Sequence, residues 1–325
     1  MKAIVSSSPD EPLEARDLPE ARLRPNELRV RVQAAGVNPA DWKMRSYFYL
    51  GVARRVIGAP GPFVPGIDFA GIVESAGSSV GFPRVGDRVM GSTDFSRRQR
   101  GSYAEYVHVR PDQVAILPPE VSAEEAACLP VPGVTAYRGL FDLGGLSDTI
   151  PLDPKQRSRK VLVLGASGGV GHLAVQLAHS RGCFVAGVCS AKNAELVERL
   201  GGLPIDYRSG DALSLAEAQG PFDVIVDCVG SQAYPTERCE RLLTQSGILV
   251  LFMPRLHDAR ALFKVTRVKT LLVQPRSNIL DRLVSDLAEK RIRVVIADRI
   301  PLSEAERAHA ISKSGHVVGK LVLVG

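Results

Sequence analysis

The chain has 325 residues, of which 45% are hydrophobic and 23% charged, and its formal net charge is +6. This length is enough for two domains with separate cores, and the composition excludes a disordered or collagen-like chain. No run of about 18 uncharged apolar residues occurs and the start soon becomes acidic, so we expect neither a membrane span nor a signal peptide and predict a cytoplasmic protein.

Residues 2–119 predict a mostly antiparallel β domain. Short β-type runs alternate with turn residues, as in "KAIV", "ELRVRVQAAGV", "FAGIVESAG", "GDRVMG", "SYAEYVHV" and "QVAILP". The next stretch, 120–141, has a helical pattern, and Ser122 is placed to cap its first turn. Residues 144–159 have the composition of a long surface loop.

From residue 161 onward, strand and helix patterns alternate. We expect strands at 161–165, 183–190, 222–230, 247–252 and 268–275, and helices at 169–181, 193–201 and 234–245. Continuous apolar strands of this kind are typical of a parallel sheet that is covered on both faces. The sequence therefore predicts an α/β domain after the β domain.

The C-terminal segment does not extend this alternation cleanly. It contains an amphipathic helix at 277–291 and a closing strand at 316–325, and we expect it to rejoin the first domain. The predicted boundaries are 1–128 for the N-terminal part of the β domain, 129–275 for the α/β domain, and 276–325 for the returning segment.

The stretch "VLVLGASGGVG", 161–171, predicts a dinucleotide-binding turn. A strand that enters a glycine-rich turn followed by a helix presents bare backbone N–H groups and a positive helix end, which bind a pyrophosphate. The spacing departs from strict G-x-G-x-x-G, and such turns also occur for steric reasons alone. The strand before and the helix after the turn favour the nucleotide. The predicted binding residues are Ser167, Gly168, Gly169, Val170 and Gly171.

The end of the second predicted strand indicates which dinucleotide is bound. An acidic residue there would hold the adenosine ribose of NAD, but the chain reads "VCSAKN", with Ser190 and Lys192. Tyr207 and Arg208 begin the next stretch and add two donors for a 2′-phosphate. We therefore predict NADPH as the cofactor. The alternative for Lys192 alone is a solvated lysine at a helix start.

Several motifs together resemble one family. They are "AAGVNPADWKMRS", "FVPGIDFAGIVESAGSSV", "VGDRVMG", "GSYAEYV", "PGVTAYRGL", "GASGGVGHLAVQLA", "FDVIVDCVG" and "GKLVLV". The chain resembles the zinc-independent, zeta-crystallin-like quinone oxidoreductase branch of the medium-chain dehydrogenase/reductases, and most of all its reticulon-interacting and chloroplast-envelope members. The resemblance implies a GroES-like distorted β-barrel catalytic domain, a Rossmann doubly wound parallel sheet, an active site in the cleft and a homodimer.

The resemblance also implies that no metal takes part. Zinc-containing relatives carry cysteine at the position of Asn38, histidine at Ile67 and cysteine near Val131, and all three ligands are missing here. The five cysteines form no C-x-x-C pair, so a cysteine-rich zinc lobe is not expected either. Without a Lewis acid, reduction of an electron-poor C=C bond is favoured over alcohol dehydrogenation.

The resemblance places Asn38 and Asp41 near the nicotinamide and the substrate. Asn38 would orient a carbonyl through its amide, and Asp41 would order Lys43 or a ribose hydroxyl. Tyr49 and Lys43 are the candidate proton donors. Two alternatives stay open, because "NPAD" is also typical of a turn or helix start, and Tyr49 would equally suit the lining of an apolar pocket.

Five further residues match family positions that touch the nicotinamide half of the cofactor: Thr135, Val229, Gly230, Phe252 and Met253. Packing at a strand end is the alternative role, above all for Phe252. Homodimer formation would use the sheet edge near 247–252, because an exposed apolar edge strand tends to be paired.

These observations predict an NADPH-dependent oxidoreductase that reduces quinones or the C=C bond of α,β-unsaturated carbonyls. The alternatives are a dedicated biosynthetic tailoring reductase for one conjugated intermediate, or a non-catalytic NADPH-binding protein of crystallin-like or RNA-binding type. The basic clusters at 96–100 and 157–160 lack interleaved aromatic residues, so we expect no nucleic-acid partner.

Overall fold

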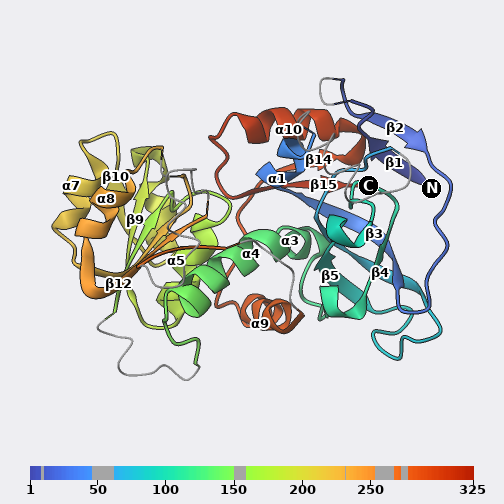
Figure 1. Cartoon of the computed structure of the whole chain (residues 1–325), viewed down its shortest axis with the longest axis horizontal. Coiled ribbons are helices and arrows are strands. Elements are labelled where there is room, and N and C mark those ends of the chain that lie inside the picture. Colours follow the sequence, from blue (N-terminus) through green and yellow to red (C-terminus); the bar gives the residue numbers. More distant parts are fainter. Residues whose placement is uncertain (9–10, 46–61, 150–158, 231, 253–266, 272–276) are drawn as a thin grey trace. The chain divides into compact units, whose positions relative to one another are not determined.

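The computed structural model describes residues 1–8, 11–45, 62–149, 159–230, 232–252, 267–271 and 277–325. The chain divides into two compact units (Figure 1). The first contains Met1–Val134, Gln274–Glu289 and Val294–Gly325, and the second contains Thr135–Val273 and Lys290–Arg293. The sequence predicts a boundary at residue 128, whereas this first unit continues to Val134. It includes Val131, whose N–H donates to the Asp68 carboxylate.

The first unit is built on a seven-stranded sheet in the order β14-β15-β3-β4-β5-β7, with β6 beside β3, and a separate β1-β2 pair. Its strands are β1 Lys2–Val5, β2 Glu14–Asp17, β3 Leu28–Val37, β4 Asp68–Ala76, β5 Arg88–Ser92, β6 Tyr106–Val109, β7 Val114–Ile116, β14 Ile296–Pro301 and β15 Lys320–Val324. All pairs except β14-β15 are antiparallel, which confirms the predicted β domain.

The helices of the first unit are short. They are α1 Pro39–Lys43, α3 Ala123–Ala127, α4 Pro130–Tyr137, which ends in the second unit, α9 Ser277–Ala288 and α10 Ala305–Lys313. The helix expected over 120–141 is thus broken, since Pro130 disfavours a helical conformation at Leu129. Ser122 is its N-cap as predicted, with its hydroxyl accepting from the N–H of Glu125 at 3.2 Å.

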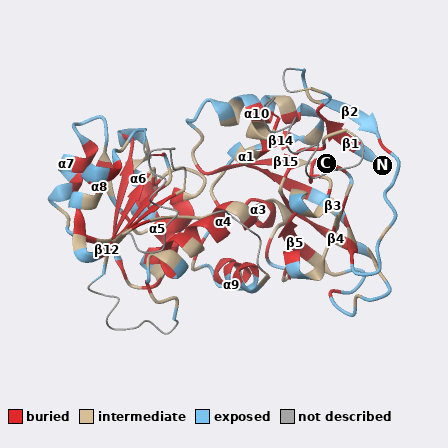
Figure 2. Ribbon diagram, in the orientation of Figure 1, coloured by how far each residue is buried: buried red, intermediate tan, exposed pale blue. Residues whose placement is uncertain are grey.

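The second unit holds a fully parallel six-stranded sheet in the order β10-β9-β8-β11-β12-β13. Its strands are β8 Lys160–Leu164, β9 Phe184–Cys189, β10 Leu203–Asp206, β11 Phe222–Asp227, β12 Leu243–Leu251 and β13 Val268–Thr270, and its helices are α5 Gly171–Ser180, α6 Ala194–Arg199, α7 Ala212–Glu217 and α8 Thr236–Arg241. Figure 2 shows the buried central strands. Numbered within the unit, the order is 3-2-1-4-5-6, which confirms the predicted Rossmann sheet.

One expectation about the edge of this sheet is wrong. Residues 247–251 of this run belong to β12, which pairs with β11 on one side and with β13 on the other. The edge strand is therefore β13, and the edge argument for a homodimer through 247–252 does not hold. Among the described residues, we find no helix that is both long and apolar enough to cross a bilayer.

Candidate functional site

The turn after β8 brings the chain sharply into α5. Gly165 has φ +82°, a conformation that favours glycine, and its carbonyl accepts from the N–H of Gly168 at 3.0 Å. A Cβ on Gly171 would lie 2.1 Å from that same carbonyl oxygen. The second of these glycines therefore allows the helix start to approach the end of β8.

The turn exposes backbone donors. In the part of the chain that the structure describes, the N–H groups of Ser167, Gly169 and Val170 donate to no backbone acceptor. A Cβ on Gly168 would meet only the Gly165 carbonyl oxygen, at 3.4 Å, so there is open space above the turn. Unpaired amides at a helix start, next to open space, fit a pyrophosphate. Asn193, which sequence reasoning missed, holds Ser167 by a side-chain hydrogen bond of 2.9 Å.

The loop after β11 lies beside this turn. A Cβ on Gly165 would come within 2.7 Å of a Val229 methyl group, and Val229 is 50% exposed. The buried Asp227 carboxylate accepts from the N–H groups of Val229 and Gly230 at 2.9 and 2.8 Å, and so shapes the loop. The structure therefore brings the predicted residues Val229 and Gly230 to the switch point between β8 and β11, where open α/β sheets bind ligands.

At the end of β9, the structure corrects two predictions about the residues that would hold the 2′-phosphate. Ser190 is buried, so the exposed donors there are Lys192, Tyr207 and Arg208. Sequence reasoning found no carboxylate at this point, but Asp206 of the neighbouring strand β10 accepts from the N–H of Ala191 at 3.0 Å. The parallel register, which pairs Asp206 with Cys189, brings it there. The absence of a carboxylate is thus no longer an argument for NADPH, whereas the exposed donors still are.

The other residues expected near the nicotinamide differ in their surroundings. Thr135 is buried in α4. The ring of Phe252 packs so closely on Gly139 that a Cβ on that glycine would lie 2.6 Å from the ring. This contact supports a packing role for Phe252. Met253 lies outside the described residues, as does Tyr49 in the first unit.

In the first unit, Asn38 and Asp41 form the start of α1. The Asp41 carboxylate accepts from the backbone N–H of Asn38 at 2.7 Å and from the Tyr103 hydroxyl at 3.2 Å. Burial, the largest cause, raises the pKa of Asp41 to about 7, and Asp68 adds to the rise. Asp41 therefore caps the start of α1, which was the alternative to a direct role near the nicotinamide. Lys43, at the last position of α1, has a pKa lowered by partial burial.

The side chain of Asn38 belongs to a buried network that sequence reasoning missed. Its Nδ2 donates to Asp68 at 2.9 Å, and its Oδ1 accepts from the Lys320 ammonium at 2.6 Å. The Asp68 carboxylate also accepts from the Ser92 hydroxyl and from the N–H of Val131. Burial raises the pKa of Asp68 to about 6, and Lys320 opposes this rise. Asp68 and Lys320 both stand in motifs quoted above, "PGIDFAG" and "GKLVLV".

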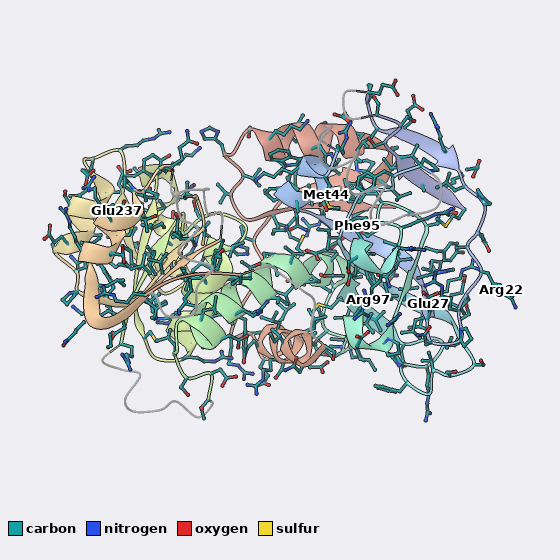
Figure 3. All side chains as sticks on the ribbon, in the orientation of Figure 1. Arg22, Glu27, Met44, Phe95, Arg97 and Glu237 are labelled. Carbon is teal, nitrogen blue, oxygen red and sulfur yellow. The ribbon has the colours of Figure 1, made fainter. Side chains whose placement is uncertain are left out.

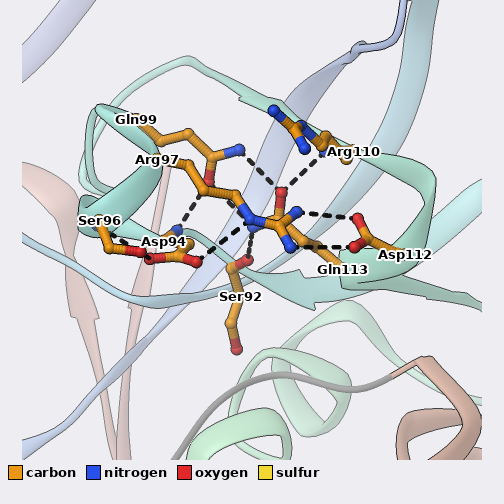
Figure 4. A network of polar contacts seen from close by, with 8 residues as sticks. All are labelled: Ser92, Asp94, Ser96, Arg97, Gln99, Arg110, Asp112 and Gln113. Atoms are coloured by element: carbon orange, nitrogen blue, oxygen red, sulfur yellow. Dashed lines mark hydrogen bonds and ion pairs between the residues drawn. The ribbon is translucent and has the colours of Figure 1, made fainter.

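Figure 4 shows how Ser92 is held in place. Its carbonyl accepts from Gln113 Nε2 at 2.9 Å, and Gln99 Nε2 donates to Gln113 Oε1 at 2.8 Å. Arg97 and Asp112 form a two-point ion pair beside them, with both distances 3.0 Å. Ser92 therefore connects Asp68 to a second network of hydrogen bonds, which includes the more exposed Arg97–Asp112 ion pair.

The residues of the first unit do not fit a catalytic zinc ion. Oδ1 of Asn38 already accepts an ammonium group, whose charge would repel a divalent cation. Ile67 and Val131 offer no side-chain ligand. Among the described residues, no group of three or more His, Cys, Asp or Glu side chains is placed to hold a metal.

The far side of Asp41 leads to a buried histidine. His309 lies 3.3 Å from the Tyr103 hydroxyl through Nε2 and 3.3 Å from Arg45 through Nδ1. Because arginine only donates, Nδ1 is the acceptor and the ring is neutral. Burial, with Arg45 as the next cause, lowers the pKa of His309 to about 4, while Glu306 opposes this shift and Lys313 adds to it.

This histidine gives a pH prediction. We expect it to reduce the free energy of unfolding as pH falls from about 6.5 to about 4, because there the unfolded chain binds a proton that the folded chain does not. Asp41 and Asp68, with raised pKa, act in the opposite sense, so a variant must isolate the histidine. In urea unfolding at pH 7, 6 and 5, the free energy of unfolding of the wild type relative to that of His309→Gln should decrease as pH falls, and a constant difference would contradict the assignment.

A separate surface pocket of about 90 Å³ lies in the first unit. Arg22, Glu27 and Arg100 are among its lining residues, and Figure 3 labels the first two. None of the predicted catalytic or cofactor-binding residues lines it. We therefore assign the candidate site to the residues described above and not to this pocket.

Comparisons with known proteins match segments of both units to dehydrogenase families. Residues 24–119 match the alcohol dehydrogenase GroES-like domain family, and residues 202–323 match the zinc-binding dehydrogenase family. A chloroplast envelope quinone oxidoreductase homolog of Arabidopsis thaliana is 33% identical over 319 residues, which cover 96% of this chain and 93% of that protein.

Two further proteins extend the comparison. The 2-methylene-furan-3-one reductase of Solanum lycopersicum is 32% identical, with 93% of this chain and 72% of that protein covered. The structure of Escherichia coli quinone oxidoreductase complexed with NADPH has a TM-score of 0.77 and 26% identity, and the match covers 100% of this chain and 99% of that one.

Proposed function

The chain belongs to the quinone oxidoreductase branch of the medium-chain dehydrogenase/reductase superfamily, and from this premise we propose that it is an NADPH-dependent, zinc-independent reductase of quinones or of α,β-unsaturated carbonyls. The observation that carries the proposal is the glycine turn, whose unpaired amides and open space fit a pyrophosphate. NADPH is bound in the Escherichia coli relative, which supports the same cofactor here. A cytoplasmic location and a homodimer stay predictions.

The second unit would hold the cofactor. Ser167 to Gly171 would bind the pyrophosphate, and Lys192, Tyr207 and Arg208 the 2′-phosphate. When bound, NADPH supplies the hydride that reduces the acceptor. Thr135, Val229 and Gly230 would position the nicotinamide half, with Met253 as an untested prediction and Phe252 as a packing residue beside it.

The first unit would act on the acceptor. Addition of a hydride leaves negative charge on the acceptor oxygen, so a fixed hydrogen-bond donor is needed there. Asn38 can supply it, since only one of its two Nδ2 hydrogens is used by Asp68 in the described residues. The completing proton would come from Lys43, whose lowered pKa favours its release, or from Tyr49.

The function is tested by NADPH oxidation, followed at 340 nm, with a panel of quinones and α,β-unsaturated ketones. We expect turnover on at least one of the two classes and none with simple alcohols and NADP⁺. Addition of a zinc chelator should leave the rate unchanged. Tight NADPH binding with no turnover on the whole panel would overturn the enzyme proposal and favour the non-catalytic alternative, which salt-dependent RNA binding would then test.

The panel also separates two kinds of reductase. The similarity to a 2-methylene-furan-3-one reductase favours a conjugated enone as acceptor. A dedicated biosynthetic enzyme would be nearly silent on common quinones and active on a narrow set of enones, whereas a broad quinone range would indicate a general quinone reductase.

A further inference from the structure

Lys320 is a buried lysine that the proposed chemistry has not yet used. It is 4% exposed and occupies the first position of β15. Its Nζ donates to the carbonyl of Val37 and to Oδ1 of Asn38, both at 2.6 Å. A buried ammonium costs free energy unless it is paired and hydrogen-bonded. These two partners, Val37 and Asn38, directly precede the first residue of α1.

The two neighbours of the Asn38 amide allow only one orientation of that group. Lysine is only a donor and an ionised carboxylate only an acceptor, so Oδ1 must face Lys320 and Nδ2 must face Asp68. The ammonium also draws electron density from Oδ1, which strengthens the amide hydrogens as donors. The amide is thus both fixed and polarised by its partners.

Resting on the proposed function, we propose that Lys320 is a positioning residue: it orients and polarises the Asn38 amide so that its second Nδ2 hydrogen is offered to the acceptor oxygen. Lys320 acts through Asn38 and does not itself touch the acceptor. Among the described residues, the charged or titratable groups that interact with the ammonium are Asp68, Asp41 and Cys128. Asp68 is in turn fixed by Ser92 and Val131, so the far end of the network is rigid.

The first test is a double-mutant cycle. We expect Lys320→Met to lower kcat/KM for the acceptor about tenfold, while the Kd for NADPH changes less than twofold. In an Asn38→Ala background the same substitution should have little further effect, because its route to the acceptor is already gone. Lys320→Arg, which keeps the charge and the donors, should restore part of the rate. An equal loss in both backgrounds, or no loss in either, would overturn the proposal.

A second variant guards against misfolding. Lys320→Met alone leaves the Asp68 carboxylate buried without its nearby cation, which is strongly destabilising. Lys320→Met combined with Asp68→Asn removes both charges and should fold. We expect this charge-balanced variant to have a lower kcat/KM than Asp68→Asn alone, since only the former has lost the contact between Lys320 and the Asn38 amide. Equal rates in the two folded variants would show that Lys320 contributes only to stability.

A third measurement does not depend on turnover. The chain has only four asparagines, so selective ¹⁵N labelling gives four side-chain amide pairs, and Asn38→Ala identifies the one of interest. Asp68→Asn adds a fifth amide pair, so the charge-balanced variant is compared with Asp68→Asn alone. Loss of Lys320 should then shift the Asn38 amide and make its protons exchange at least tenfold faster, with the pairs of Asn26, Asn193 and Asn278 unchanged. An unchanged Asn38 signal would refute the positioning role. If the signal responds but the wild type reduces no acceptor, the proposed function fails while the contact is established.

Discussion

Gly171→Ala is expected to weaken NADPH binding at least a hundredfold. The added Cβ would lie 2.1 Å from the Gly165 carbonyl oxygen and 2.8 Å from its carbon, and both atoms belong to the backbone. Since neither can move independently, the start of α5 must shift away from β8. The amides of Ser167 to Val170 would then no longer converge on one point. Isothermal titration with NADPH measures the effect.

Two glycines provide matched controls for this prediction. A Cβ on Gly168 meets only one atom, at 3.4 Å, so Gly168→Ala should fold normally but raise the Kd for NADPH about tenfold by filling space next to the phosphate. A Cβ on Gly81, in the first unit, meets nothing within 4 Å, and Gly81→Ala should bind like the wild type. Unaltered binding by a folded Gly171→Ala would mean that the turn is not the pyrophosphate site.

The glycine turn is an example of what can be predicted from the sequence, because all the residues that form it are close together in the chain. The strand, the glycine turn and the helix after it follow one another within residues 160–180, so local periodicity and turn chemistry were enough to place them. The alternation that continues to β12 predicted the parallel sheet for the same reason. Ser122, whose partner Glu125 is three residues away, was likewise a local capping signal.

Contacts between distant segments were not predictable in this way. Lys320 and Asn38 are separated by 282 positions, and only the pairing of β15 with β3 brings them together. Asp68 reaches Asn38 through the pairing of β3 with β4, and Asp206 reaches Ala191 through the register of β10 with β9. No periodic pattern signals such contacts. The polar partners that orient the candidate site are therefore the part that sequence reasoning missed.

The Asp206 carboxylate lies close to where the 2′-phosphate of NADPH would bind, so the preference between NADPH and NADH has to be measured. Lys192 and Arg208 are exposed, and neither forms an ion pair with a carboxylate in the described residues, so both are available to a 2′-phosphate. We expect the wild type to prefer NADPH over NADH in spite of the nearby Asp206. Lys192→Glu should raise the Kd for NADPH at least a hundredfold, because a charge-assisted hydrogen bond is replaced by repulsion. The Kd for NADH should change about threefold or less.

Asp206→Asn is the matched control for Lys192→Glu, since it keeps an oxygen to accept from the N–H of Ala191 while removing the negative charge. It should bind NADPH somewhat more tightly and NADH no better. The two variants thus move the preference in opposite directions at one end of the sheet, which a general loss of stability would not do. If Lys192→Glu weakened both coenzymes equally, the lysine would be supporting the fold of the loop; if the wild type bound both alike, the 2′-phosphate would have no dedicated site here.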